Sequence, residues 1–190
     1  MSLRVLVIPE DPTLNGYILK PLVKAIIADA GKSNAQVTVL ANPRLNGYDA
    51  AKKAISGGQL DDKYRHFDLW LFMPDADRAK KDSMDDLERQ LNNRKIRLIC
   101  CPAVPEVEIY ACVAYRDEFN WKEARGSSSM KETFFAKLLA THGDPNRSSE
   151  GRDLMIASSL KNKRKLYSLC PELKGLRDQI GDRIKKGTHS

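Results

Sequence analysis

Two stretches of the chain are apolar at nearly every position, and a proline follows each of them. They cover residues 3–8 and 69–73. Continuous apolar runs of this length are typical of strands that are buried on both faces of a parallel sheet. Residues 37–40 and 96–101 form two further strand-like runs. The pattern therefore predicts four strands in the first hundred residues.

Between these strands, apolar residues recur at helical spacing. The helical segments are residues 18–27, 49–55 and 83–92, and Ser83 is a candidate N-cap for the last of them. Strands that alternate with helices are typical of a sheet covered by helices. We therefore expect an α/β core over residues 1–102, with a mostly parallel four-stranded, Rossmann-like sheet flanked by helices.

The pattern changes after Pro102, where helical spacing replaces the alternation. Gly, Pro and Ser residues separate the predicted helices, and residues 143–149 read as a loop. The predicted helices are residues 107–115, 129–139, 154–169 and 173–184. Residues 103–190 are therefore expected to form a helical extension that packs on the core.

Basic residues are concentrated in the carboxyl-terminal part of the chain. The net charge is +7, and residues 1–115 contribute only +1 of it, from 16 basic and 15 acidic side chains. Residues 116–190 contribute +6, from 16 basic and 10 acidic side chains. Such asymmetry is typical of a surface that binds a polyanion, although a solvated helical face is also often basic.

The composition is that of an ordinary globular protein, with 42% hydrophobic and 30% charged residues among 190. No window approaches the roughly 18 apolar residues that a membrane span requires. The first residues run directly into a predicted strand, so no secretory leader is expected. The four cysteines have neither a disulfide rhythm nor a zinc-ligand spacing. These features predict a cytoplasmic protein with reduced thiols and no membrane partner.

Acidic residues follow two of the predicted strands. Glu10 and Asp11 come after the first strand, and Asp75 and Asp77 come after the third. In open parallel sheets, ligands gather outside the carboxyl ends of the strands. If the two strands are neighbours, three or four carboxylates meet there, and a cation is the natural way to neutralise them. Oxygen ligands without His or Cys favour Mg²⁺ or Mn²⁺.

A simpler interpretation exists for each acidic residue alone. Asp75 or Asp77 could form a turn or cap the next helix, and Asp11, which precedes Pro12, reads as a turn residue. Glu10 makes the combination a more specific indication of a cation site than either aspartate alone, because it comes at the end of a second apolar strand.

This arrangement resembles the Toprim domain of topoisomerases, primases, OLD-family nucleases and ribosomal-RNA maturation nucleases. The matching residues are Glu10 after the first strand and the pair Asp75 and Asp77 after the third. The resemblance is closest to small Toprim-like proteins of phage-defence and mobile-element neighbourhoods. Toprim glutamates are usually followed by glycine, whereas this chain has Asp11 and Pro12.

The resemblance implies a magnesium-dependent nuclease, or a nuclease-like protein, that acts on nucleic-acid phosphodiesters. Glu10, Asp75 and Asp77 would be its catalytic residues and metal ligands. Glu108, and with less support Glu106, would reach the same site as a ligand of a second metal; a solvated helix residue is the alternative for Glu108.

Nucleic acid, either DNA or RNA, is the expected partner, and basic residues would contact its phosphates. Arg78, Lys80 and Lys81 follow the acidic pair directly, where they could steer a phosphate towards the metal. The densest basic cluster lies further along the chain, where a solvated face is the alternative. It consists of Lys161, Lys163, Arg164 and Lys165.

Two other functions fit part of the pattern. A non-catalytic adaptor or regulatory subunit could keep the acidic pocket and work with a separate ATPase, because the chain has no P-loop of its own; a homodimer is a further possible assembly. An aspartyl-phosphate receiver would match Glu10, Asp11 and Asp75. A receiver also needs a hydroxyl residue after the fourth strand and a Lys-Pro dipeptide after a fifth, and the chain has neither.

Overall fold

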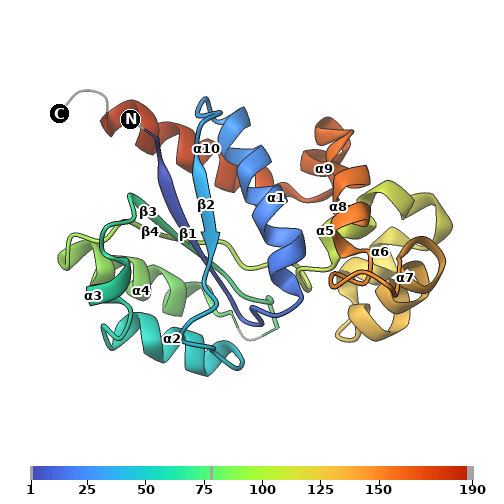
Figure 1. Ribbon diagram of the computed structural model, residues 1–190, viewed down its shortest axis with the longest axis horizontal. Helices are drawn as coiled ribbons and strands as arrows, with labels where there is room; N and C mark the ends of the chain where they lie inside the picture. The colour runs from blue at the N-terminus through green and yellow to red at the C-terminus, as the bar shows by residue number, and fades with distance from the viewer. Residues whose placement is uncertain (1, 78, 188–190) are drawn as a thin grey trace.

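A computed structural model describes residues 2–77 and 79–187, with side chains up to residue 185. Four parallel strands form one sheet in the order β2-β1-β3-β4 (Figure 1). The strands are β1 (Arg4–Pro9), β2 (Gln36–Val39), β3 (Leu69–Met73) and β4 (Leu98–Cys100). The predicted α/β fold with a parallel four-stranded sheet is therefore confirmed. Because β1 pairs directly with β3, the segments that follow them leave the sheet side by side.

Helices cover both faces of the sheet. Alternate side chains of the strands point to opposite faces, so Leu6 and Trp70 pack on one side while Val5 and Leu71 pack on the other. The four helices between the strands are α1 (Asn15–Asp29), α2 (Tyr48–Ser56), α3 (Asp61–Tyr64) and α4 (Lys81–Asn93). Helices α2, α3 and α4 lie on the face of Leu6, and α1 lies on the face of Val5 (Figure 1).

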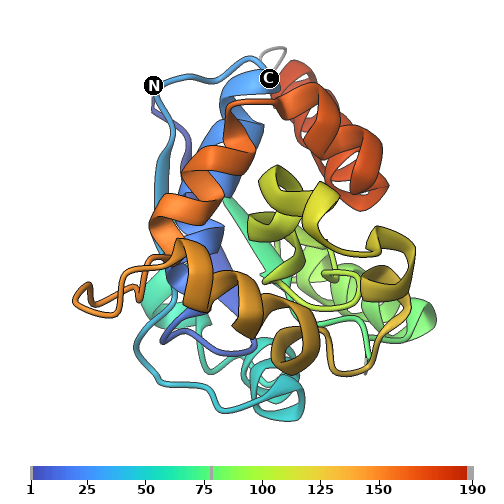
Figure 2. The same ribbon diagram turned by 90° about the vertical axis from the view of Figure 1, so that its right-hand side faces the viewer.

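The chain after β4 packs on the same face as α1 (Figure 2). Its elements are α5 (Ile109–Cys112), a 3₁₀ helix η1 (Val113–Glu118), α6 (Trp121–Gly126), a π-helical turn η2 (Lys131–Phe135), α7 (Ala136–His142), α8 (Arg152–Leu160), α9 (Lys163–Leu169) and α10 (Pro171–Gly187). Apolar residues of this region share one buried cluster with β1 and α1. The predicted helical carboxyl-terminal region is confirmed, and it is continuous with the core.

The predicted helix over residues 154–169 is wrong, because two helices occupy this stretch. Helix α8 ends at Leu160 and α9 begins at Lys163. Between them, the side chain of Asn162 accepts a hydrogen bond from the backbone N–H of Lys165, which caps the second helix. The apolar spacing continues across this break, so the pattern does not show it.

Other boundaries also differ from the prediction. Residues 107–115 and 129–139 were expected to be regular helices but contain 3₁₀ and π turns, and α3 and α6 were not predicted. Helix α4 begins at Lys81, so Ser83 is not its cap, and the Ser83 hydroxyl is buried without a hydrogen-bond partner. Residues that form only one or two turns carry too little periodicity for the pattern to resolve them.

A buried serine links α8 to the segment that contains α5 and η1. The Ser159 hydroxyl donates to the carbonyl oxygen of Ala111 at 3.0 Å and accepts from the N–H of Ala114 at 3.1 Å. We expect Ser159→Ala to lower the free energy of unfolding by about 1–2 kcal/mol, because it removes the partner of the buried Ala111 carbonyl and of the partly buried Ala114 N–H. Urea denaturation measures this, with Ser158→Ala as the matched control. Equal effects of the two substitutions would contradict the prediction.

The described part of the chain has no helix that is long and apolar enough to cross a membrane. All four cysteines are free, and Cys101, Cys112 and Cys170 are buried.

Candidate functional site

Glu10 and Asp75 meet at the carboxyl edge of the sheet. Pro9 is in register with Met73, so the residues that follow β1 and β3 emerge next to each other. The Asp75 backbone N–H donates to Oε2 of Glu10 at 3.4 Å. The pairing of the two strands therefore brings together two of the predicted site residues that lie 65 positions apart in the sequence.

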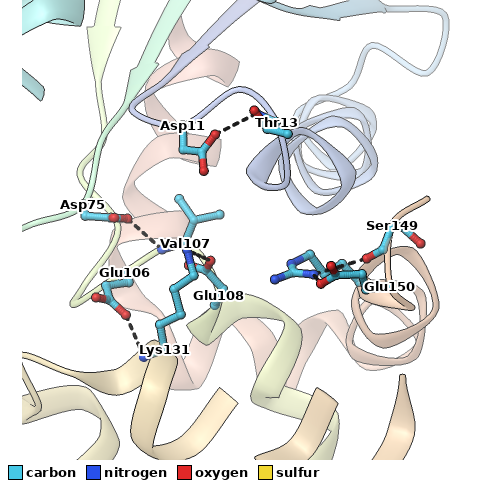
Figure 3. A network of polar contacts seen from close by, with 10 residues as sticks. Asp11, Thr13, Asp75, Glu106, Val107, Glu108, Lys131, Ser149 and Glu150 are labelled. Carbon is cyan, nitrogen blue, oxygen red and sulfur yellow. Dashed lines mark hydrogen bonds and ion pairs between the residues drawn. The ribbon is translucent and has the colours of Figure 1, made fainter. Parts of the chain in front are cut away.

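The segment after β4 completes this edge. Ala76 donates its backbone N–H to the carbonyl oxygens of Ala103 and Pro105, both at 2.9 Å. Oδ1 of Asp75 accepts a hydrogen bond from the N–H of Val107 at 3.0 Å (Figure 3). This contact fixes the Asp75 carboxylate and brings residues 106–108 towards it.

Negative charge accumulates around Asp75. The pKa of its carboxyl group is raised to about 7, first by burial and then by the charges of Glu108, Glu10 and Glu106. The Val107 N–H opposes this shift, because a hydrogen bond to the carboxylate favours the charged form. A carboxyl group perturbed by both burial and like charges is a common property of functional sites.

Lys131 contacts both glutamates of the segment after β4 (Figure 3). Its backbone N–H donates to Oε2 of Glu106 at 2.8 Å, and its Nζ lies 3.2 Å from Oε1 of Glu108. Glu108 is only 1% exposed, whereas the Lys131 side chain is 38% exposed. Lys131 is therefore the cation that the structure provides to a carboxylate buried inside the protein.

The pKa of the Lys131 ammonium reflects these neighbours. Burial acts to lower it, but the charges of Glu108 and Asp11 raise it overall. Arg152 acts in the opposite direction, which places a second cation near Lys131. The raised pKa keeps the Lys131 ammonium protonated, so it can interact with an anion beside the carboxylates.

Arg152 is almost completely buried, with 4% exposure. Its guanidinium forms an ion pair with Glu150, and its carbon Cζ lies 5.3 Å from the centroid of the Phe135 ring. Its Nε is buried without a hydrogen-bond partner. Sequence reasoning missed both Arg152 and Lys131, because neither belongs to a motif and each reaches the site through the packing of short helices.

The other residues near the predicted acidic motifs have different environments. Asp11 accepts a hydrogen bond from the N–H of Thr13 at 2.8 Å, as a turn residue does (Figure 3). Asp77 lies in a turn and is exposed, and it is not among the charges that most raise the pKa of Asp75. Arg78 lies outside the described residues. The proposed metal-binding role of Asp77 remains a prediction.

The predicted phosphate-binding residues fall into two separate regions. Lys80 and Lys81 are exposed at the start of α4, and Lys81 forms an ion pair with Asp85 at 2.6 Å. The cluster of Lys161, Lys163, Arg164 and Lys165 lies around α9, where Lys163 pairs with Asp29 at 2.6 Å. Asp29 ends α1, whereas the carboxylates lie near the start of that helix. The cluster is therefore at the far end of α1 from Glu10 and Asp75.

The donor set suits a hard divalent cation only in part. Over residues 2–77 and 79–187, no group of three or more His, Cys, Asp or Glu side chains is placed to hold a metal ion. Magnesium, however, commonly binds through one or two carboxylates and completes its shell with water and substrate phosphates. Glu10 and Asp75 lie close enough to act as such a pair, and the raised pKa of Asp75 shows that burial and the charges of Glu108, Glu10 and Glu106 disfavour its carboxylate form.

Comparisons with protein-family models, with curated proteins and with solved structures find no match to this chain. The functional assignment therefore depends on the site itself.

Proposed function

We propose that the chain is a metal-dependent phosphodiesterase that acts on nucleic acid, with its site at the carboxyl edge of the sheet. The observation that carries this proposal is the meeting of Glu10 with Asp75 in a patch where negative charge and burial raise the pKa of Asp75 to about 7. Mg²⁺ or Mn²⁺ would relieve this repulsion. The resemblance to Toprim domains is consistent with this site, and the free cysteines are consistent with a cytoplasmic location.

Each residue has a distinct role in the proposed site. Glu10 and Asp75 would hold the cation, with Asp77 as a further candidate ligand. When bound, such a cation polarises a phosphoryl oxygen and lowers the pKa of a bound water. Lys131 and Arg152 would contact the phosphate, because Lys131 lies 3.2 Å from Glu108 and Arg152 is near enough to affect the pKa of Lys131.

Cleavage assays test the proposal on plasmid DNA, single-stranded DNA and structured RNA, with Mg²⁺, Mn²⁺ or a chelator. We expect metal-dependent cleavage by the unmodified chain and its loss in the variant Glu10→Gln with Asp75→Asn. Asp62→Asn, which removes an exposed carboxylate from α3, is the matched control and should cleave normally. Cleavage that survives the double substitution would contradict the assignment of this site.

The adaptor function remains the second candidate, because Lys131 already neutralises Glu108 and three convergent ligands are not found among the described residues. Metal-dependent thermal stabilisation of the unmodified chain, without cleavage and without stabilisation of the double variant, would favour it. The receiver function gains no support, since the described sheet has four strands and thus no fifth strand to carry the required lysine.

A further inference from the structure

A cavity of about 500 Å³ lies at the amino edge of the sheet, opposite the carboxylates. The starts of β1 and β3 form one side of it, and α10 forms another; these elements lie together near the N-terminus in Figure 1. Ligand sites for small molecules commonly have volumes of roughly 300–1,000 Å³. The cavity is therefore large enough for an organic molecule, and the site proposed above does not use it.

Positive charge dominates the lining of this cavity. Arg4, Lys32, Arg97 and Arg183 line it, whereas Asp68 is the only acidic residue among the described residues of its lining. Asp68 already pairs with Arg4, with 3.4 Å between Nη2 and Oδ1, and it also accepts the backbone N–H of Arg4 at 2.7 Å. The other three cations form no ion pair within 4.0 Å in the part of the chain that the structure describes. The cavity thus has an excess of positive charge.

Two of these cations are near each other. Burial lowers the pKa of the Arg183 guanidinium, Glu88 opposes this, and the positive charge of Arg97 lowers it further. Two arginines that repel each other beside a cavity gain most from an anion placed between them, because an anion can accept hydrogen bonds from both.

The remaining surface of the cavity is aliphatic. Leu69 and Ile180 are buried, and Leu3 and Ile184 are partly exposed next to them. An inorganic anion would leave this surface in contact with water, whereas an apolar group would cover it. The two kinds of lining together favour a ligand that has both an acidic group and an apolar body.

We propose that this cavity binds an amphipathic organic anion, whose acidic head group lies between Arg97, Arg183 and Lys32 and whose apolar body covers Ile180 and its aliphatic neighbours. This proposal is independent of the proposed function, because the cavity and the carboxylates lie at opposite edges of the sheet.

The test uses the full chain and the probe 8-anilinonaphthalene-1-sulfonate, which carries a sulfonate on an aromatic body and fluoresces when its surroundings are apolar. We expect saturable binding of the probe, and we expect sodium decanoate to displace it. Decanol, which lacks the acidic group, and inorganic phosphate, which lacks the apolar body, should displace the probe much less. Arg97→Gln and Arg183→Gln should each weaken binding by about tenfold, which is an ordinary size for a charge-assisted contact.

Lys24→Gln is the matched control, because Lys24 is exposed on α1 and does not line the cavity. It should leave binding unchanged, and circular dichroism should show that all three variants are folded. Arg97 is exposed, so its substitution is not expected to disturb folding. The proposal is overturned if the unmodified chain does not bind the probe, if Arg97→Gln binds it normally, or if Lys24→Gln weakens binding as much as Arg97→Gln.

Discussion

Asp75→Asn is expected to stabilise the protein at pH 8 by roughly 2–4 kcal/mol, measured by urea denaturation in the presence of a chelator. The reason is the raised pKa of Asp75, about 7 in the folded chain against an ordinary value of 3.8. At pH 8 the folded protein must hold this carboxylate charged, close to Glu10, Glu106 and Glu108. Asparagine removes the charge and keeps an oxygen that can accept the Val107 N–H.

The effect must depend on pH in a definite direction. Because the folded-state pKa is above the unfolded-state value, the destabilisation is nearly absent below pH 3.8, grows between pH 3.8 and about 7, and is complete above that range. The gain from Asp75→Asn should therefore fall from its full size at pH 8 to under ~1 kcal/mol at pH 4.

An exposed carboxylate provides the control for this experiment. Asp62→Asn should change stability by less than about 0.5 kcal/mol at either pH. If Asp75→Asn destabilises the protein at pH 8, or stabilises it equally at both pH values, the described environment of Asp75 is wrong. Excess Mg²⁺ adds a second comparison: a cation that binds only the unmodified site should narrow the difference between the two proteins at pH 8.

The two central strands, β1 and β3, were predictable because they are buried on both faces over nearly all their length. Uninterrupted apolar runs such as residues 69–73 distinguish these strands from the helices around them. The region after β4 was less predictable, since its helices are short and their breaks fall on polar residues. Asn162 is an example. The apolar residues of α8 and α9 suggest one continuous helix, but the Asn162 side chain caps the start of α9 and so separates the two.

The site was predictable only where it depends on the sheet. The rule that ligands gather beyond the carboxyl ends of parallel strands correctly brought Glu10 near Asp75. Lys131 reaches the same edge through a hydrogen bond from its backbone N–H to the Glu106 carboxylate, and no periodic signal accompanies such a bond. Arg152 follows Gly151, whose φ of +92° belongs to a local turn, and nothing in its sequence neighbourhood indicates a site.

The ion pair between Lys131 and Glu108 should also contribute to the stability of the fold, and this contribution can be measured apart from catalysis. Glu108 is buried at 1% exposure, and its Oε1 lies 3.2 Å from the Lys131 ammonium. Removal of one partner of a buried ion pair leaves the other charge without compensation, which costs about 3–5 kcal/mol when both are fully buried. Since Lys131 is 38% exposed, water screens this pair in part, and a smaller effect is expected.

We therefore expect Lys131→Met to lower the free energy of unfolding at pH 7.5 by roughly 1–3 kcal/mol. Glu108→Gln should recover most of this loss when it is combined with Lys131→Met, because it removes the buried charge that the lysine compensated. Urea denaturation of the two single variants and the double variant gives the coupling energy between the side chains. Lys137→Met is the control. It makes the same chemical change at an exposed lysine of α7 that does not compensate a buried carboxylate.

The coupling energy also bears on how a cation would enter the site. A coupling below ~0.3 kcal/mol would mean that Lys131 does not neutralise Glu108, and the interpretation of this pair would fail. A substantial coupling would mean that the ammonium already occupies the position where positive charge is most favourable near Glu108. A divalent cation would then bind through Glu10 and Asp75 instead. Lys131 would remain beside it as a fixed positive charge, available to the phosphate of a substrate.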